Sequence, residues 1–536
     1  MSEHIIDLVV VCVYLIALMI FGLWIGRREK ADREGYFLGG RKFGWIAIGT
    51  SLFATNISSI NFVGHAGLAY QAGMSAANPQ LIGGLMMALA AIVFIPVFLR
   101  SRLYTIPDFL EQRFDRRAML IYCLVVFLTG LVAVPTMVYA GCLVMLQLFG
   151  LDPSQLPLCA VLVGGAVGIY TITGGLASVV YTDVAQAGLL LLGGVLAVVL
   201  GLQAAGGLEA VIAHAPASHL SLIQRDHHAA MPASGVFTGL LISSFFWASS
   251  NHEMLQRTLG AKDTRNAQLG MLLAAGLKLL AVFLLVFPGL IALKLFPDVA
   301  PDLAYPTLIK TVLPVGLSGL VLAGFLAALM SSLDSALLSL SSIFTLKICP
   351  AFRRESEATP AADQERSALL IGRVAAGFLL VWGIIAAPFI QHLGLIYLIG
   401  MKVNGLMMSS IGVCYVFGRF SKRVNERGAF VTLILGLVFG ISLIVQTSLP
   451  SLQTLTPEWW NSLHFFHLTA GLAVIFSIIL YVTSLTAPAP RAEQLRIVAP
   501  FIRTAGDSAT ATPWWRGFKF WLAVYLVGVA GVYLIF

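Results

Sequence analysis

Long apolar segments separated by short polar ones recur along the chain. Each apolar segment approaches the roughly 20 residues that a helix needs to cross a membrane. The pattern predicts an all-α polytopic membrane protein with about 14 transmembrane spans, near residues 5–25, 49–67, 76–99, 119–149, 156–172, 182–202, 236–251, 267–295, 303–348, 369–390, 395–417, 429–449, 466–485 and 520–536. In the segment 303–348, Pro306 and Pro314 break the helix, so a short external stretch precedes the span.

One predicted span, 49–67, has an unusual middle. Positions 54–59 read Ala-Thr-Asn-Ile-Ser-Ser, and five of these six side chains are small or polar. Such side chains form hydrogen bonds with nearby backbone and favour close helix packing. One interpretation is an interrupted helix that offers carbonyl groups to a cation and amide groups to a polar solute. The alternative is an unbroken helix whose small residues serve only packing.

Positive charge is concentrated in every second loop. The net charge is +8, and 28 of the 33 lysine and arginine residues fall in loops 27–42, 100–117, 257–265, 347–373, 419–427 and 491–519. Basic loops stay on the cytoplasmic side, so we predict an integral protein of the plasma membrane or the bacterial inner membrane with both termini on the outer side. We expect the first span to be retained, because its basic residues follow the apolar run, whereas a signal peptide has them before it.

Composition narrows the possible functions. The chain is 58% hydrophobic and 11% charged, and its loops are too short for an independent soluble domain. A nucleic-acid partner or an enzymatic domain is therefore not expected, and no nucleophile–base pair stands out. The six cysteines and the loop histidines lack the spacing of a metal site or a disulfide framework.

Ionisable residues inside predicted spans indicate a functional site, because burying a charge in a membrane is costly. Lys278 lies more than ten residues from the nearest basic loop, so it needs a partner or a wet cavity. Lys402 and Asp334 also lie within apolar segments. Asp183 has two interpretations: a site residue, or a cap at the start of the span 182–202.

A serine-rich segment supplies oxygen ligands at helical spacing. Ala328, Ser331 and Ser332 stand at i, i+3 and i+4, so they share one helix face. With carbonyls freed at Ala54 and Ile57, they would place five oxygens around Na⁺. A second cation site is predicted from Asp183, Ser331, Asp334 and Ser335. The alternative is that these serines serve only packing.

At this point the chain resembles the sodium/solute symporter family, and most closely its sodium/glucose cotransporter branch. The resemblance runs from about residue 34 to about residue 430. It depends on several motifs in order: GTSLFATNISSINFVG, YTIPDFLEQRF, YTITGGLASVVYTDVAQ, LQRTLGAKD, AYPTLIKTVLPVGLSGL, ALMSSLDSALLSLSSIFTLKI and KRVNERGAF. The resemblance implies a LeuT-type core of two inverted five-helix repeats with flanking helices, alternating access, and coupling of Na⁺ entry to solute uptake.

The implied domain boundaries are an N-terminal flanking span (1–30), a first five-helix repeat (43–202), an external loop (203–235), a second five-helix repeat (236–418), two flanking spans (428–485), a cytoplasmic loop (486–519) and a C-terminal span (520–536).

The resemblance also assigns site residues. The family's main sodium site falls on Ala54, Ile57, Ala328, Ser331 and Ser332. A further sodium site of some relatives falls on Asp183, Ser331, Asp334 and Ser335. Relatives place serine or threonine at Asp334, so a bound cation and a bound proton both stay possible there. The implied solute-binding positions are Asn61, Gln80, Ser244, Trp247, Lys278, Met401 and Lys402. The branch has a glutamate at Gln80 and a glutamine at Met401, so the resemblance does not extend to glucose as the solute.

Three functions remain open. The first is Na⁺-coupled symport of a sugar or polyol, with Na⁺ as coupling ion and no other cofactor. The second is Na⁺-coupled symport of a carboxylate or amino acid, paired by Lys278 or Lys402. The third, a channel or a membrane sensor, fits poorly because the polar residues cluster at one depth and no signalling domain is visible. The oligomeric state stays open, and a single chain contains every predicted site residue.

Overall fold

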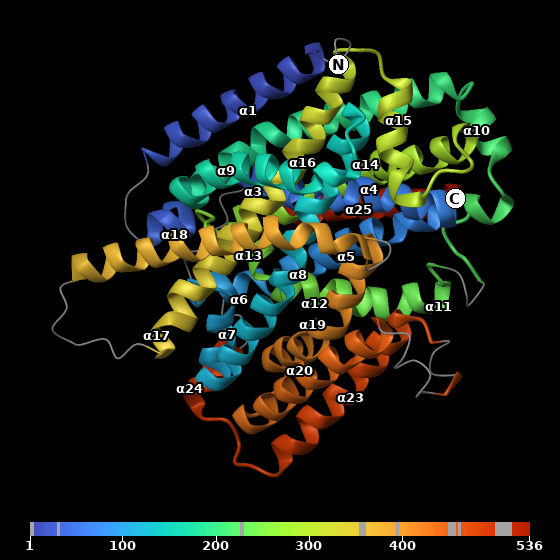
Figure 1. The fold of residues 1–536 in the computed structure, drawn as a ribbon. Coiled ribbons are helices and arrows are strands. Elements are labelled where there is room, and N and C mark those ends of the chain that lie inside the picture. Colours follow the sequence, from blue (N-terminus) through green and yellow to red (C-terminus); the bar gives the residue numbers. More distant parts are fainter. Residues whose placement is uncertain are drawn as a thin grey trace.

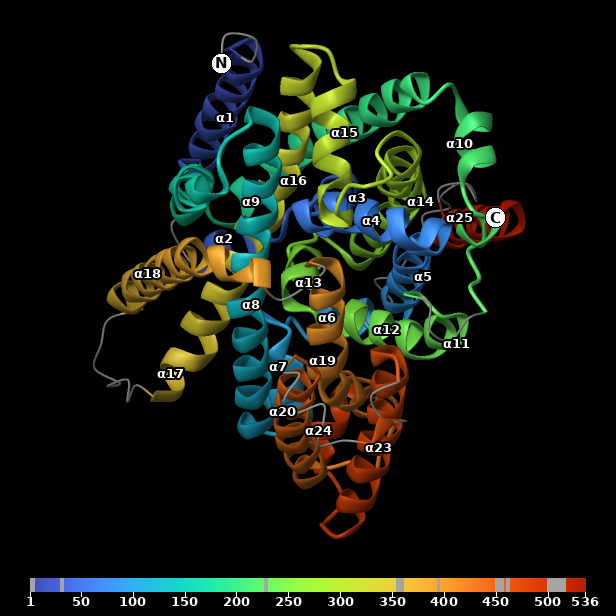
Figure 2. The ribbon, with the colours of Figure 1, turned by 45° about the vertical axis from the view of Figure 1, so that its right-hand side comes forward.

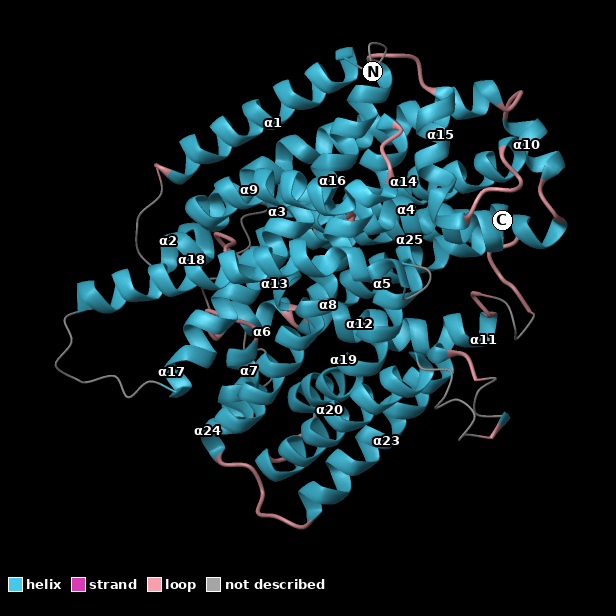
Figure 3. Ribbon diagram, viewed as in Figure 1, coloured by secondary structure: helices cyan, strands magenta, loops and turns pink. Residues whose placement is uncertain are grey.

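The computed structural model describes residues 5–28, 33–225, 230–352, 361–392, 396–448, 457–458, 463–498 and 517–536. Within them every regular element is a helix, apart from two isolated bridges (Figure 3). Eleven helical segments are long and apolar enough to cross a membrane. The predicted all-α membrane protein is thus confirmed. Residues 226–229 of the predicted external loop and 499–516 of the predicted cytoplasmic loop lie outside the described part.

The helices of the first half of the chain are α1 (Ile5–Gly26), α2 (Arg33–Leu38), α3 (Trp45–Asn56), α4 (Ser59–Ala72), α5 (Asn78–Val93), α6 (Ile95–Arg100), α7 (Pro107–Arg113), α8 (Arg116–Phe149), α9 (Leu156–Ala204) and α10 (Leu208–His214). Those of the second half are α11 (Ala233–Gly235), α12 (Leu241–Ser250), α13 (His252–Leu259), α14 (Thr264–Leu295), α15 (Ala304–Val312), α16 (Leu317–Ile343), α17 (Cys349–Phe352), α18 (Ala361–Ala386), α19 (Ile396–Phe420), α20 (Glu426–Ser448), α23 (Phe465–Leu485), α24 (Ala492–Leu495) and α25 (Phe518–Ile535).

Every one of the fourteen predicted spans corresponds to helix. Among the eleven long apolar segments, Ser59–Val93 joins α4 and α5, while α3, the first part of α9 and α19 lie outside them. The short external stretch predicted before α16 is α15, which ends at Val312 just before Pro314. The described residues thus contain eleven helical segments with the length and hydropathy of a membrane span, compared with the fourteen spans predicted.

The predicted interruption of the span 49–67 is confirmed. Helix α3 ends at Asn56, and Ile57 leaves the helical region with φ −99° and ψ 81°. Ser58 is extended, with ψ 172°, and α4 begins at Ser59. Ile57 and Ser58 are both buried, so protein and not lipid surrounds this non-helical backbone.

A second break, which the sequence analysis did not predict, follows α12. Helix α12 ends at Ser250, Asn251 is extended with ψ 116°, and α13 begins at His252. The Asn251 side chain accepts a hydrogen bond from the backbone N–H of Met254 (2.9 Å) and so caps α13. The sequence Ser-Ser-Asn at 249–251 resembles the small polar run of the first break, and this signal was available.

Helix α9 covers two predicted spans in one element. It bends at Gly175, where φ is 66° and ψ is −172°. Asp183 therefore lies eight residues inside the second part of α9. The interpretation of Asp183 as a cap at the start of a span is wrong, because the helix begins well before it.

The helices around the two breaks form the centre of the molecule. Helix α16 is the most enclosed, since 94% of its span is buried, compared with 11% for α25. It packs against α8 and α9, while α14 packs against α3, α4 and α5 (Figures 1 and 2). Helices α19, α20 and α23 pack on one another and extend away from this centre in both views.

Described residues of all six basic loops contact one another. Hydrogen bonds join them directly, from Arg41 to Leu103 and Leu259, from Arg113 to Ser421, from Lys347 to Glu111, and from Gln494 to Phe114. Elsewhere Asp7 near the N-terminus accepts the backbone N–H of Gly316 (2.7 Å). The last residue, Phe536, accepts the N–H of Leu222 in the predicted external loop (3.2 Å). Both ends of the chain therefore contact predicted external segments.

Candidate functional site

The break between α3 and α4 frees four carbonyl groups from helical hydrogen bonds. The Thr55 carbonyl accepts the hydroxyl of Ser332 (2.9 Å), and the Asn56 carbonyl accepts the side-chain amide of Asn61 (2.8 Å). Within the described part of the chain, no hydrogen bond reaches the carbonyl oxygen of Ala54 or of Ile57. These two are the carbonyls that the sequence analysis assigned to a cation.

The serine face of α16 lies against this break. Ala328, Ser331 and Ser332 are fully buried. The Ser332 hydroxyl donates to the Thr55 carbonyl, and the Ser331 hydroxyl donates to Asp183 (2.5 Å). Each hydroxyl proton is therefore used, while the oxygen lone pairs stay available for a cation.

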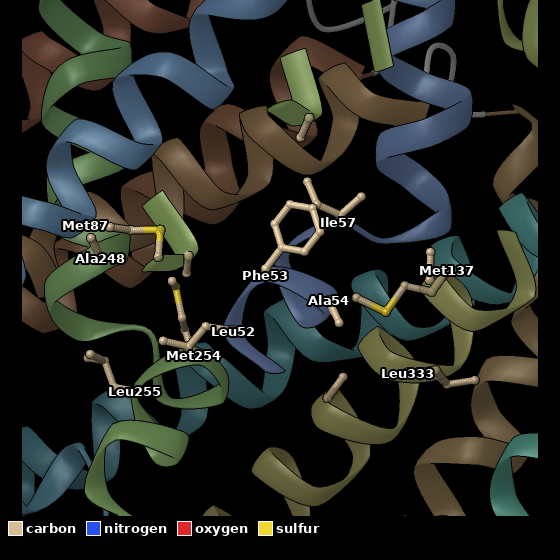
Figure 4. Close-up of a cluster of buried hydrophobic side chains, with 14 of the residues drawn as sticks. Leu52, Phe53, Ala54, Ile57, Met87, Met137, Ala248, Met254, Leu255 and Leu333 are labelled. Carbon is tan, nitrogen blue, oxygen red and sulfur yellow. The ribbon is translucent and has the colours of Figure 1, made fainter. Parts of the chain in front are cut away.

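Apolar side chains surround the break. Figure 4 shows Ala54 and Ile57 among side chains from other helices, including Met137 of α8 and Leu333 of α16. Such surroundings exclude water, which strengthens the interaction of a cation with the few oxygens present.

Asp183 is at the centre of a buried polar cluster. It pairs with the guanidinium of Arg257 (3.2 Å) and accepts hydrogen bonds from Ser51 (2.5 Å) and Ser331 (2.5 Å). Arg257 also donates to Ser51 (2.6 Å) and to the hydroxyl of Ser335. The cluster joins four segments that are distant in sequence: α3, α9, α13 and α16.

The place of Arg257 corrects the sequence analysis. We counted it among the charges of the basic loop 257–265, but its side chain is 1% exposed and pairs with a buried carboxylate. The second break explains the difference, because it turns the chain into the short helix α13, which carries Arg257 inward. Sequence reasoning also missed Ser51 and Thr55, although both lie one turn apart on α3 beside Ala54.

The structure brings together the four residues of the predicted second cation site. Ser335 donates to Asp334 (3.1 Å) and lies 3.2 Å from the hydroxyl of Thr55, while Ser331 contacts Asp183. All four are buried. The Arg257 guanidinium contacts both Asp183 and Ser335, so a protein cation lies directly beside this cluster.

A second polar network lies on the other side of the break. Lys278 of α14 donates to the side-chain carbonyl of Gln80 on α5 (2.8 Å). The Gln80 amide nitrogen faces His65 (3.1 Å) and the side-chain oxygen of Asn61 (3.4 Å). Three predicted solute-binding residues, Asn61, Gln80 and Lys278, thus meet. His65 was missed, although a histidine inside an apolar segment was a visible signal.

The other four predicted solute-binding residues lie on two helices nearby. Ser244 and Trp247 belong to α12, and Met401 and Lys402 belong to α19; α12 packs against both α5 and α19. All four side chains are partly buried. Among the described residues, none of the four forms a hydrogen bond or an ion pair with the Lys278 network.

Known proteins share this architecture. The chain is 30% identical over 544 residues to the sodium/myo-inositol cotransporter of Mus musculus, covering 91% of this chain and 74% of the mouse protein. A Na⁺-coupled sialic acid symporter, solved substrate-bound and outward-open, matches with a TM-score of 0.77 at 22% identity, over 90% of this chain and 98% of that one. Mhp1, a nucleobase-cation-symport-1 family transporter, matches with a TM-score of 0.53 at 15% identity, over 86% and 97%.

These comparisons settle the fold and the broad activity. The two solved structures confirm the predicted LeuT-type fold. Residues 36–436 match the description "Sodium:solute symporter family". The protein is a sodium-coupled solute symporter and not an enzyme. By the length of this match and by its likeness to the mouse cotransporter, the chain belongs to the Sodium:solute symporter family.

Proposed function

We propose that Na⁺ binds at the break in the first core helix, to the carbonyls of Ala54, Ile57 and Ala328 and the hydroxyls of Ser331 and Ser332. The two free carbonyls of Ala54 and Ile57 are the observation that carries this proposal. Buried carbonyls without donors are costly, and a small hard cation is the ligand that satisfies them. The ion would thereby stabilise the break and hold α16 against it.

The solute binds on the other side of the same break, against Asn61, Gln80 and Lys278. Ser244, Trp247, Met401 and Lys402 complete the proposed pocket from α12 and α19. Trp247 stacks on the solute and closes the inward path. Release of Na⁺ to the cytoplasm loosens the break and frees the solute, which is alternating access driven by the ion gradient.

The proposed solute is a polyhydroxylated small molecule of the sugar or polyol class. The name of the mouse relative, a sodium/myo-inositol cotransporter, supports this class. The pocket residues support it too, because amide and hydroxyl side chains read hydroxyl groups through hydrogen bonds.

Uptake by a Ser332→Ala variant tests the sodium site. The substitution removes one proposed ligand and the hydrogen bond to the Thr55 carbonyl. We expect Na⁺-driven uptake into proteoliposomes to be lost, while the protein still reaches the membrane. Ser341→Ala is the matched control, because Ser341 is a buried serine of the same helix whose hydroxyl, among the described residues, bonds only to the Leu338 carbonyl of that helix (2.9 Å). Normal uptake by Ser332→Ala would remove this assignment.

A second cation, either Na⁺ or a proton, is proposed at Asp183, Ser331, Asp334 and Ser335. The support is that these buried oxygens lie together around α16. The Arg257 guanidinium beside Asp183 competes with an ion for this carboxylate. The number of ions per cycle therefore depends on how firmly Arg257 holds Asp183.

We propose that the basic loops face the cytoplasm, with both termini outside, and that the two repeats cover 43–202 and 236–418. The bonds that join all six basic loops support a common side. A cysteine at Ser218 should react with a membrane-impermeant maleimide from outside intact cells, while one at Lys262 should react only after permeabilisation. The reverse labelling pattern would invert the topology.

A further inference from the structure

Lys278 is a buried cation near the middle of a membrane-spanning helix. Its side chain is 4% exposed, and it lies in α14 between Thr264 and Leu295. Of its three N–H groups, one donates to the side-chain carbonyl of Gln80 (2.8 Å). No other hydrogen bond from Lys278 occurs among the described residues, so two of its N–H donors remain for a ligand.

The neighbouring side chains can be arranged in only one way. A lysine cannot accept a hydrogen bond, so Gln80 must turn its oxygen to Lys278 and its amide nitrogen to His65. The His65 nitrogen that faces Gln80 is then an acceptor. The other ring nitrogen donates to the backbone carbonyl of Asn61 (3.1 Å), which makes His65 neutral. Gln80 is therefore held in place and contributes no negative charge.

No carboxylate in the described structure neutralises Lys278. The ion pairs there are Arg41–Glu34, Arg257–Asp183, Lys347–Asp108 and Lys347–Glu111. Asp334, the other carboxylate of the core cluster, bonds to Ser335 on α16. Once Na⁺ is bound at the break, a second positive charge lies near Lys278, and the proposed sodium ligands are all neutral.

The geometry points to a solute that supplies the missing charge: a polyhydroxylated organic acid, such as a uronate or an aldonate, whose carboxylate accepts the two remaining Lys278 donors. A neutral polyol offers acceptors to the ammonium but leaves its buried charge unpaired, which is costly in a dry site. This inference rests on the proposed function, since it places the acid in the same pocket and retains Na⁺ coupling.

Uptake into proteoliposomes with labelled solutes tests the inference. The panel contains D-glucuronate, D-gluconate, myo-inositol, D-glucose and propionate, each with an inward Na⁺ or K⁺ gradient. We expect Na⁺-driven uptake of a sugar acid with a kcat/KM about thirtyfold or more above that of either neutral solute, which is the effect of one buried charge pair. Propionate lacks hydroxyl groups and should be a poor substrate.

Two substitutions locate the effect. Gln80→Glu gives Lys278 a carboxylate within the protein, so it should lower the ratio of sugar-acid uptake to myo-inositol uptake about thirtyfold. Lys278→Gln should lower sugar-acid uptake similarly. Lys294→Gln is the control, because Lys294 lies on the same helix and donates to the Ala205 carbonyl (2.6 Å). Stabilisation of each purified variant by Na⁺ confirms that it is folded.

The outcomes separate this inference from the proposed function. Na⁺-driven uptake of myo-inositol or glucose without preference for the acids would overturn the acid and leave the symport of a polyol standing. An acid preference that Gln80→Glu leaves unchanged would also overturn it. If no hydroxylated solute of the panel shows Na⁺-driven uptake, both this inference and the proposed solute class fail.

Discussion

At the residue scale, the buried pair of Asp183 and Arg257 has the largest energetic consequences. The exposed fraction of the side chain is 0% for Asp183 and 1% for Arg257. Their mutual attraction offsets part of the cost of removing both charges from water, and Ser51 and Ser331 donate two further hydrogen bonds to the carboxylate. Removing one partner leaves the other charge buried and unpaired.

We expect Arg257→Gln to destabilise the folded protein by about 3–5 kcal/mol, which is typical of breaking a buried ion pair. The double variant Asp183→Asn/Arg257→Gln should recover part of this loss, because two neutral amides leave no unpaired charge. Thermal unfolding of the purified proteins, followed by tryptophan fluorescence, measures both effects. Additive losses in the double variant would show that the two side chains act independently.

Sequence reasoning at this scale found residues whose role depends on local spacing. Ser331 and Ser332 are three and four residues from Ala328, and helical geometry alone puts them on one face. Arg257 could not be found in this way, because its place depends on the turn at Asn251. His65 acquires its meaning only from Gln80, fifteen residues away on another helix.

At the element scale, α9 depends on a single glycine. The backbone at Gly175 has φ 66° and ψ −172°, a region open only to glycine. A Cβ atom there would also lie 2.9 Å from a ring carbon of Tyr36 and 3.0 Å from its carbonyl oxygen. The bend places the second part of α9, with Asp183, against α3 and α16.

Gly175→Ala should therefore destabilise the protein by about 1–3 kcal/mol or more, since backbone strain and the contact with Tyr36 act together. Gly188→Ala is the control on the same helix, where an added Cβ meets nothing within 4 Å. Because alanine favours a helix over glycine, the control should be neutral or slightly stabilising. Equal melting temperatures for the two variants would contradict this account.

The eleven long apolar helices were predictable because each contains enough apolar residues to be recognised without tertiary information. The break at Ile57 was predictable for a similar reason, since small and polar residues interrupt an apolar run. The break at Asn251 was not recognised. There, polar residues at 249–252 lie next to a segment that looked like an ordinary loop, and only packing distinguishes the helix α13 from such a loop.

At the scale of the whole molecule, one residue connects the two proposed sites. The Asn61 amide donates to the Asn56 carbonyl (2.8 Å) and to the hydroxyl of Ser58 (3.1 Å), both in the break. Its side-chain oxygen faces Gln80 (3.4 Å), which holds Lys278. A solute that moves Gln80 or Asn61 therefore changes the hydrogen bonding of the backbone between Ala54 and Ile57, where we place Na⁺.

Asn61→Ala should uncouple the two ligands while keeping every proposed sodium ligand. In the wild type, solute and Na⁺ should each raise the affinity for the other by the same factor, and couplings of this kind are about 5- to 150-fold. Titrating Na⁺ against thermal stability, with and without the best solute of the uptake panel, measures this factor. In Asn61→Ala, Na⁺ should still stabilise the protein, but the factor should approach one.

Gln268→Ala supplies the comparison for this experiment, because its amide lies in α14 and donates to the Ala91 carbonyl (2.9 Å), away from the break. It should retain the full coupling. A coupling factor that is unchanged in Asn61→Ala would mean that the solute reaches the ion by another route, such as movement of α16. The ratio between the Na⁺ affinities measured with and without saturating solute separates the two explanations. A variant whose solute site is merely weakened binds the solute less tightly, but this ratio stays the same at saturating solute.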